Sequence, residues 1–406
     1  MRNKELGFNA MAMTNATEIS GRVAANEVRR GLPYGNVCQS LRRIAGYGAF
    51  GLAIALLPLP QALADSDDQH RQILPVQSSI IPANGDQNPY GVAFVPFVPG
   101  GPLHPGDILV SNFNNAGSAP TGNFQGTGRT IVKVAPNGET SLFFEFQGNS
   151  PIGLTTALGV LKRGFVLVGS VPTIDGTFGT LQPGSLLVLD RNGVLKATLT
   201  NLLDSPWDLT IQDGGSWARV FVSNVRSGTI TRLDLDVDPG GISVRTATEI
   251  ASGYTSHSDP AALIVGPTGL AYDAENDTLY VASTADNEIF AVPHAATANQ
   301  SKGTGTVTYQ DNAHLRGPLA LAFGPNGHLL TSNGDAPTVT PPSTQTQNSE
   351  IVEFTKGGKF IGEFSIDSAA GSAFGIAIVP SGEDSARFAA VDDTTNQVTV
   401  FRLSTP

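Results

Sequence analysis

The chain has almost no sulfur. Of its 406 residues, Cys38 is the only cysteine, and the three methionines are Met1, Met11 and Met13. A single cysteine cannot form a disulfide bond within the chain, so stability must come from the hydrophobic core. Sulfur-poor chains suit an oxidising compartment without requiring one.

Charged side chains are also scarce. They make up 15% of the residues, whereas there are 46 glycines and 27 prolines. This composition leaves few good helix surfaces and is typical of short strands joined by many turns. A length of 406 residues is normal for a closed array of sheet repeats. We therefore expect an all-β fold, and the length of the chain does not require a second domain.

Positive charge is scarcer than negative charge in most of the chain. The net charge is -11, and the first 43 residues hold seven of the 24 basic residues but only three of the 35 acidic ones. The remaining chain is thus strongly acidic and repels phosphate backbones, which disfavours nucleic-acid binding. Small molecules, glycans, cations or proteins are the expected partners.

Residues 44–64 contain no charge at all. They follow a basic segment and end in Ala62-Leu63-Ala64, which is the order of a secretory signal peptide. We predict a signal peptide over 1–64 with an extended basic n-region, cleavage after Ala64, and a periplasmic or secreted protein with no membrane span after cleavage. Sec and Tat export stay open because of Arg42-Arg43, as does a start at Met11 or Met13.

One phrase recurs through the remaining chain: a small or proline residue, a variable residue, a glycine or similar residue, then apolar residues and a turn. Its six copies begin at Pro89, Pro151, Pro206, Pro267, Pro318 and Ala373. Each copy is followed by an apolar strand that stops at a small polar residue, as in Val220-Phe221-Val222-Ser223-Asn224. Copies spaced by roughly 50 to 60 residues fit four strands each. We predict a six-bladed β-propeller over 85–406.

The last copy ends one strand short. The apolar segment Ile73–Ile81 precedes the first copy, within an N-terminal segment of residues 65–84. We expect it to pair with Gln397–Leu403 and complete the sixth blade, because closure protects exposed strand edges. A monomer is the expected state.

The fourth copy carries a family resemblance. Gly266-Pro267-Thr268-Gly269-Leu270-Ala271-Tyr272, followed by Leu279–Ser283, resembles the NHL-repeat propellers, and the chain is distantly similar to SMP-30/gluconolactonase-like propellers. In the latter, metal ligands occupy the variable residue of some phrases. The corresponding residues of this chain are Tyr90, Ile152, Trp207, Thr268, Leu319 and Phe374. None is a carboxylate, amide or imidazole, so a hard-cation site is not expected there and no cofactor is predicted.

Calcium is considered at one other segment. Asp234-Leu235-Asp236-Val237-Asp238 imitates the start of an EF-hand loop, but Pro239 stands at the glycine position and Arg245 at that of the bidentate glutamate. Strand alternation puts the three aspartates on one face. A solvated sheet edge and a weak calcium site both remain open.

Aromatic residues at the channel mouth and polar residues at the strand ends favour a binding face. The ligand-binding candidates are Tyr90, Trp207, Phe374, Asn112, Asn114, Asn224, Asn333, Asp335 and Asp392. Long loops over 113–129, 172–185 and 334–349 emerge on the same face. We predict a non-catalytic binding module for a small ligand, glycan or protein. In the alternative interpretation of the aromatic residues, they simply pack the propeller axis.

An enzyme is the second functional hypothesis. The sequence contains none of the motifs G-x-S-x-G, H-E-x-x-H and G-x-x-x-x-G-K-[ST], and its six histidines are scattered. A metal-dependent hydrolase, lactonase or lyase would have to use carboxylates and amides. Its candidate residues are Asp392, Asp393, Asn333, Asp335, Asn112 and Asn114.

Overall fold

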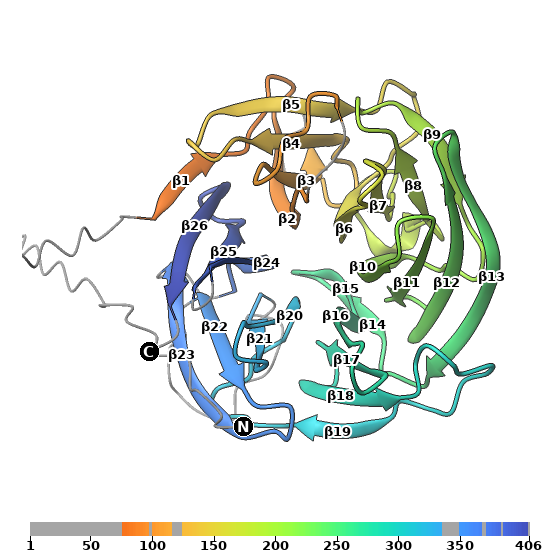
Figure 1. Ribbon diagram of the computed structural model, residues 1–406, viewed down its shortest axis with the longest axis vertical. Coiled ribbons are helices and arrows are strands. Elements are labelled where there is room, and N and C mark those ends of the chain that lie inside the picture. The colour runs from red at the N-terminus through yellow and green to blue at the C-terminus, as the bar shows by residue number, and fades with distance from the viewer. Residues whose placement is uncertain are drawn as a thin grey trace, which may run out of the picture. The chain divides into compact units, whose positions relative to one another are not determined.

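A computed structural model describes residues 75–96, 100–115, 124–334, 349–367, 371–382 and 385–404. These residues form six four-stranded antiparallel sheets arranged around one axis, as Figure 1 shows. The prediction of an all-β, six-bladed propeller is confirmed. The predicted signal peptide lies outside the described residues. Within the described ranges, no helix is long and apolar enough to cross a membrane.

Each blade is a meander that runs from the axis outwards. The inner strands are β2 (Asp86–Phe94), β6 (Leu154–Val160), β10 (Pro206–Asp213), β16 (Pro267–Asp273), β20 (Leu321–Phe323) and β24 (Ala373–Gly382). The second strands are β3 (Ile108–Asn115), β7 (Val166–Ser170), β11 (Trp217–Asn224), β17 (Thr278–Ser283), β21 (Leu329–Ser332) and β25 (Ser385–Asp392). The third strands are β4 (Thr130–Val134), β8 (Ser185–Leu189), β12 (Thr229–Asp238), β18 (Glu288–Pro293), β22 (Ser349–Phe354) and β26 (Gln397–Ser404).

The outer strands are β5 (Thr140–Glu145), β9 (Leu195–Leu199), β13 (Gly241–Ser252), β19 (Thr306–Tyr309), β23 (Phe360–Asp367) and β1 (Val76–Ser79). A 3₁₀ turn, η1 (Phe178–Thr180), lies between β7 and β8. A short hairpin, β14 (His257–Asp259) and β15 (Leu263–Val265), lies between the third and fourth blades.

The N-terminal strand closes the ring. β1 pairs antiparallel with β26, with Val76 opposite Val400 and Ser79 opposite Gln397. Figure 1 shows the two strands side by side at the edge of the sixth blade. Ile80, which follows β1, is fully buried and donates its backbone N–H to the carbonyl of Asn396. The predicted closing strand is therefore confirmed.

The core is divided between the blade interfaces. The second strands are apolar almost throughout, as in Ile108-Leu109-Val110, because both of their faces meet a neighbouring blade. Six buried apolar clusters result, one at each junction between successive blades. The cluster between the sixth and first blades also extends over the axis.

The inner strand of the second blade starts later than the repeat predicts. Leu154 pairs with Ser170 and Leu158 with Val168, so four steps along β6 face two along β7. The extra residues form a wide bulge. As a result Ile152 packs between the first two blades rather than over the axis, so grouping it with Tyr90 and Trp207 as an equivalent position of the repeat was wrong.

Close packing at the axis makes some inner-strand glycines irreplaceable. A Cβ on Gly375 would lie 2.1 Å from the backbone oxygen of Tyr90 in the next blade. We expect Gly375→Ala to destabilise the protein by about 1 to 3 kcal/mol, because a backbone atom cannot move aside cheaply. Denaturant unfolding would measure the loss.

Gly362 in β23 is the matched control, since a Cβ there would meet no atom within 4 Å. Gly362→Ala should change stability by no more than about 0.5 kcal/mol. Equal effects of the two substitutions would contradict this account of the axis.

Candidate functional site

The aromatic residues of the predicted channel mouth form a sealed plug. The ring of Tyr90 lies 4.6 Å from that of Phe374 and 5.7 Å from that of Trp207, measured between centroids. Phe113 joins them at 4.6 Å from Tyr90 and 5.4 Å from Trp207. Trp207 is only 1% exposed. The geometry matches the interpretation left open above, in which these side chains pack the axis.

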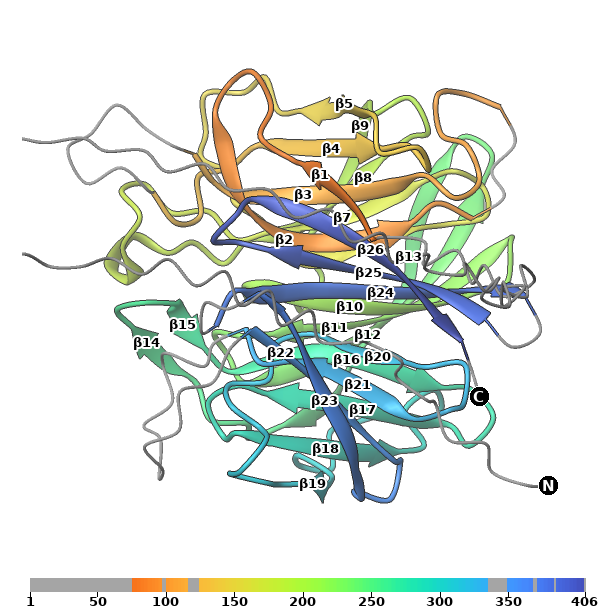
Figure 2. The ribbon, with the colours of Figure 1, turned by 90° about the vertical axis from the view of Figure 1, so that its left-hand side faces the viewer.

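The β14–β15 hairpin covers this plug. Leu263 and Ile264 belong to the same buried cluster as Tyr90 and Trp207. The hairpin begins with the exposed His257. The apolar residues that follow it reach back over the axis. Figure 2 shows the hairpin projecting at one face of the propeller.

Three asparagines of the predicted rim tie the blades together. The side-chain amides of Asn112, Asn224 and Asn333 donate to the carbonyls of Ile80, Leu202 and His314, respectively. Each of these carbonyls lies in the connection that enters the same blade from its predecessor. Asn224 and Asn333 also accept backbone N–H groups, from Asp204 and Arg316, at 3.1 and 2.8 Å. All three asparagines are fully buried, so the structure assigns them a cohesive role.

Two other predicted residues remain apart from this pattern. Asn114 is fully buried, and neither atom of its amide has a hydrogen-bond partner among the described residues. Asp335 lies outside the described residues.

A buried aspartate that sequence reasoning missed lines the axis. Asp208 is 9% exposed and borders a cavity of about 80 Å³ together with Thr156, Leu158 and Leu270. Its carboxylate accepts the backbone N–H groups of Leu209 at 2.8 Å and of Leu270, in the next blade, at 3.0 Å. Burial nevertheless raises the pKa of Asp208 to about 8. The signal was visible in the sequence, because Asp208 stands where four other copies of the phrase have glycine.

A pair of carboxyl groups ends β25 on the loop-rich face. Asp392 caps the following turn by accepting the backbone N–H groups of Thr394 at 2.9 Å and Thr395 at 3.0 Å. Asp393 donates its backbone N–H to the carbonyl of Ser372. Burial, reinforced by the charge of Asp392, raises the pKa of Asp393 to about 7. Burial also raises the pKa of Asp392. Asp393 can therefore gain or lose a proton near neutral pH.

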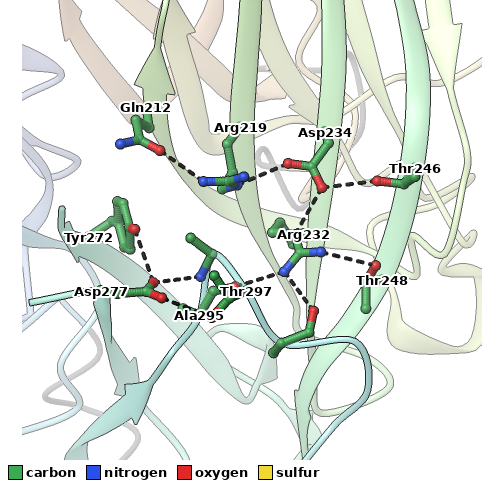
Figure 3. Close-up of polar contacts among 12 residues, drawn as sticks. Gln212, Arg219, Arg232, Asp234, Thr246, Thr248, Tyr272, Asp277, Ala295 and Thr297 are labelled. Carbon is green, nitrogen blue, oxygen red and sulfur yellow. Dashed lines mark hydrogen bonds and ion pairs between the residues drawn. The ribbon is translucent and has the colours of Figure 1, made fainter.

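Two of the three EF-hand-like aspartates, Asp234 and Asp236, form ion pairs with arginines. Asp234 lies between Arg219 at 2.9 Å and Arg232 at 3.0 Å, as Figure 3 shows. Burial alone would raise the pKa of Asp234, but the hydrogen bond from Thr246 and the two arginines lower it below its usual range. Arg232 also donates to the carbonyls of Ala295 and Ala298, which joins the third and fourth blades.

The described residues do not fit a metal site. They contain no group of three or more histidine, cysteine, aspartate or glutamate side chains that could hold an ion. Among the residues that line the cavity at the axis, Asp208 supplies the only carboxyl group.

No family model matches the chain, and neither does any curated protein. Solved structures with a similar fold include virginiamycin B lyase from Staphylococcus aureus, with 14% identity over 80% of this chain and 87% of that one and a TM-score of 0.43. A gluconolactonase from Xanthomonas campestris has 13% identity over 82% and 95%, with a TM-score of 0.47. The calcium-binding protein regucalcin from Agrobacterium tumefaciens has 13% identity over 79% and 92%, with a TM-score of 0.45.

These comparisons contradict our interpretation of the chain as a non-catalytic binding module. The lyase and the gluconolactonase are enzymes. At such low identity, what this chain shares with the matched proteins is the arrangement of six blades around an axis.

Proposed function

We propose that the chain is a hydrolase or lyase in which Asp393 is the general base. The observation that carries the proposal is a carboxyl group on the loop-rich face whose pKa is raised to about 7 by burial and by Asp392. A general base works best when its pKa lies near the working pH. Pairs of carboxyl groups in unlike environments are a recurrent way to obtain such a base.

One base serves both reaction classes. In hydrolysis, Asp393 takes a proton from water while the water oxygen bonds to the acyl carbon, and the proton then passes to the leaving alkoxide as the C–O bond breaks. In elimination, Asp393 takes the proton from the carbon next to a carbonyl, and the leaving group departs from the neighbouring carbon. Asp392, held by the N–H groups of Thr394 and Thr395, lies next to the base in the chain and helps to raise its pKa.

The test is a panel of lactones, simple esters and β-substituted carboxylic acids, assayed for acid release and for formation of a conjugated double bond. With an active substrate, kcat/KM of the parent should rise through an apparent pKa near 7, because only the ionised base accepts a proton. Asp393→Asn should lower kcat/KM by about 10² to 10⁴ and remove this rise. Assays with added calcium and with EDTA test the metal-dependent form of the hypothesis.

Asp190→Asn is the matched control. Asp190 caps the turn after β8 by accepting the N–H groups of Asn192 and Val194, much as Asp392 caps the turn after β25. It should leave activity unchanged. Full activity of Asp393→Asn, or no turnover of any class in the panel, would refute the proposal.

We also propose a repeat type, a location and a substrate class for the protein. The repeat is of the NHL type, which the phrase Gly266–Tyr272 supports. The protein acts as a monomer in the periplasm or the medium, after export directed by the uncharged segment 44–64. Its substrate is a small molecule or glycan that reaches the loop-rich face.

A further inference from the structure

A polar pocket of about 430 Å³ opens over the first blade. Its lining comes from separate segments: Asn84 precedes β2, Asn115 ends β3, Arg129 precedes β4, and Glu145 ends β5. Ile174, from the connection after β7, adds an apolar wall. This volume falls within the usual range for small-molecule sites.

Buried Asp86 holds two residues of the pocket lining, Asn115 and Arg129. It is 0% exposed, and one carboxylate oxygen accepts the amide of Asn115 at 2.5 Å. The other oxygen accepts the backbone N–H of Arg129 and the hydroxyl of Thr130, both at 2.7 Å. The ends of β3 and β4 are thereby fixed relative to each other. Preorganisation of this kind is typical of binding sites.

Opposite charges face this pocket without neutralising each other. Arg129 donates to the carbonyls of Phe146 and Gly148, at 3.4 Å each. Glu145 accepts the amide of Asn84 at 3.4 Å. Among the ion pairs of the described residues, none joins Arg129 to Glu145. Glu145 would repel a purely anionic ligand, and Arg129 would repel a purely cationic ligand.

We propose that this pocket binds a zwitterionic small molecule of the α-amino-acid type. Its carboxylate pairs with Arg129, which offers a planar fork of donors. Its ammonium group pairs with Glu145. Phe124 and Ile174 provide apolar surface for a hydrocarbon side chain. This inference does not depend on the role of Asp393.

Calorimetric titration of the intact protein with three matched probes tests the proposal. Leucine carries both charges, 4-methylpentanoate carries only the carboxylate, and 3-methylbutylamine carries only the ammonium group. Leucine should bind about tenfold or more tightly than either analogue, because a hydrogen bond to a charged group is worth roughly 1.5 to 3 kcal/mol.

Variants assign each charge. Arg129→Gln should remove the advantage of leucine over the amine, and Glu145→Gln should remove its advantage over the carboxylate. Arg191→Gln and Glu139→Gln, which alter residues outside the pocket lining, should bind like the parent. Asp393→Asn should also bind leucine normally, so this test stands apart from the activity test. No leucine binding, equal binding of the three probes, or unchanged binding by both pocket variants would overturn the proposal.

Discussion

Stability should fall as the pH rises from about 5 to about 8, and replacing Asp208 should remove much of that fall. Burial raises the pKa of Asp208 from 3.8 to about 8 in the folded protein. Between these two values the folded state holds a proton that the unfolded state has released. The contribution of Asp208 is therefore fully present at low pH and is lost as the pH rises through the folded-state pKa.

Denaturant unfolding of the parent and Asp208→Asn across this range would measure the effect. One pKa unit corresponds to about 1.4 kcal/mol, so the stability of the variant relative to the parent should increase by about 2 to 4 kcal/mol from pH 5 to pH 8. The informative quantity is the change with pH in the stability difference between variant and parent. The difference at a single pH also contains the altered hydrogen bonds with Leu209 and Leu270.

Asp175 supplies a control of opposite sign. Its exposed carboxyl has a pKa lowered by hydrogen bonds from Thr180 and Thr177. Asp175→Asn should therefore produce a small relative loss of stability as the pH rises from the lowered pKa to 3.8, and no pH-dependent change relative to the parent between pH 5 and pH 8. If the parent and Asp208→Asn ran parallel at all pH values, Asp208 would not hold its proton in the folded state.

Deleting residues 75–81 should destabilise the propeller by more than about 5 kcal/mol. The deletion removes the pairing of β1 with β26 and the buried side chain of Ile80. A buried isoleucine alone contributes about 2 to 5 kcal/mol, and each lost ladder hydrogen bond adds about 1 kcal/mol. Thermal melting and light scattering would detect the loss and the association of molecules through the exposed edge of β26.

A substitution in the same segment separates strand pairing from general truncation. Gln77 is exposed in β1, so Gln77→Ala keeps the backbone ladder and should melt close to the parent. Parent-like melting of the deletion variant would mean that the ring does not need this strand.

The sequence predicted the blades and their closure because these depend on local patterns. Short apolar runs ending at Asn112 or Asn224 identify a strand wherever it lies. Register across blades depends on bulges, which have no clear local pattern, so Ile152 was misplaced. Whether the aromatic plug binds a ligand or packs the axis could not be predicted, for a related reason. Whether Trp207 faces a ligand or a covering segment depends on Leu263 and Ile264, which are distant in sequence.

The candidate base was recognised only in part. Asp393 appeared among the residues of the enzyme hypothesis, but its raised pKa arises from burial, which a sequence does not show. Asp208 was overlooked because the variable residue of each phrase was taken as the chemically informative one. The glycine position deserved equal weight, since a carboxylate there must lie close to the next blade.

The pairing of β1 with β26 also constrains the order of events during folding. Gln77 and Thr399, whose side chains are hydrogen-bonded, are 322 residues apart, so the sixth blade cannot be completed until nearly the whole chain is available. The earlier blades use contacts between neighbouring segments and can form sooner. Contacts between such distant segments slow folding. During that interval the edges of β1 and β26 remain open, which makes ring closure the step most sensitive to chaperones and to premature self-association.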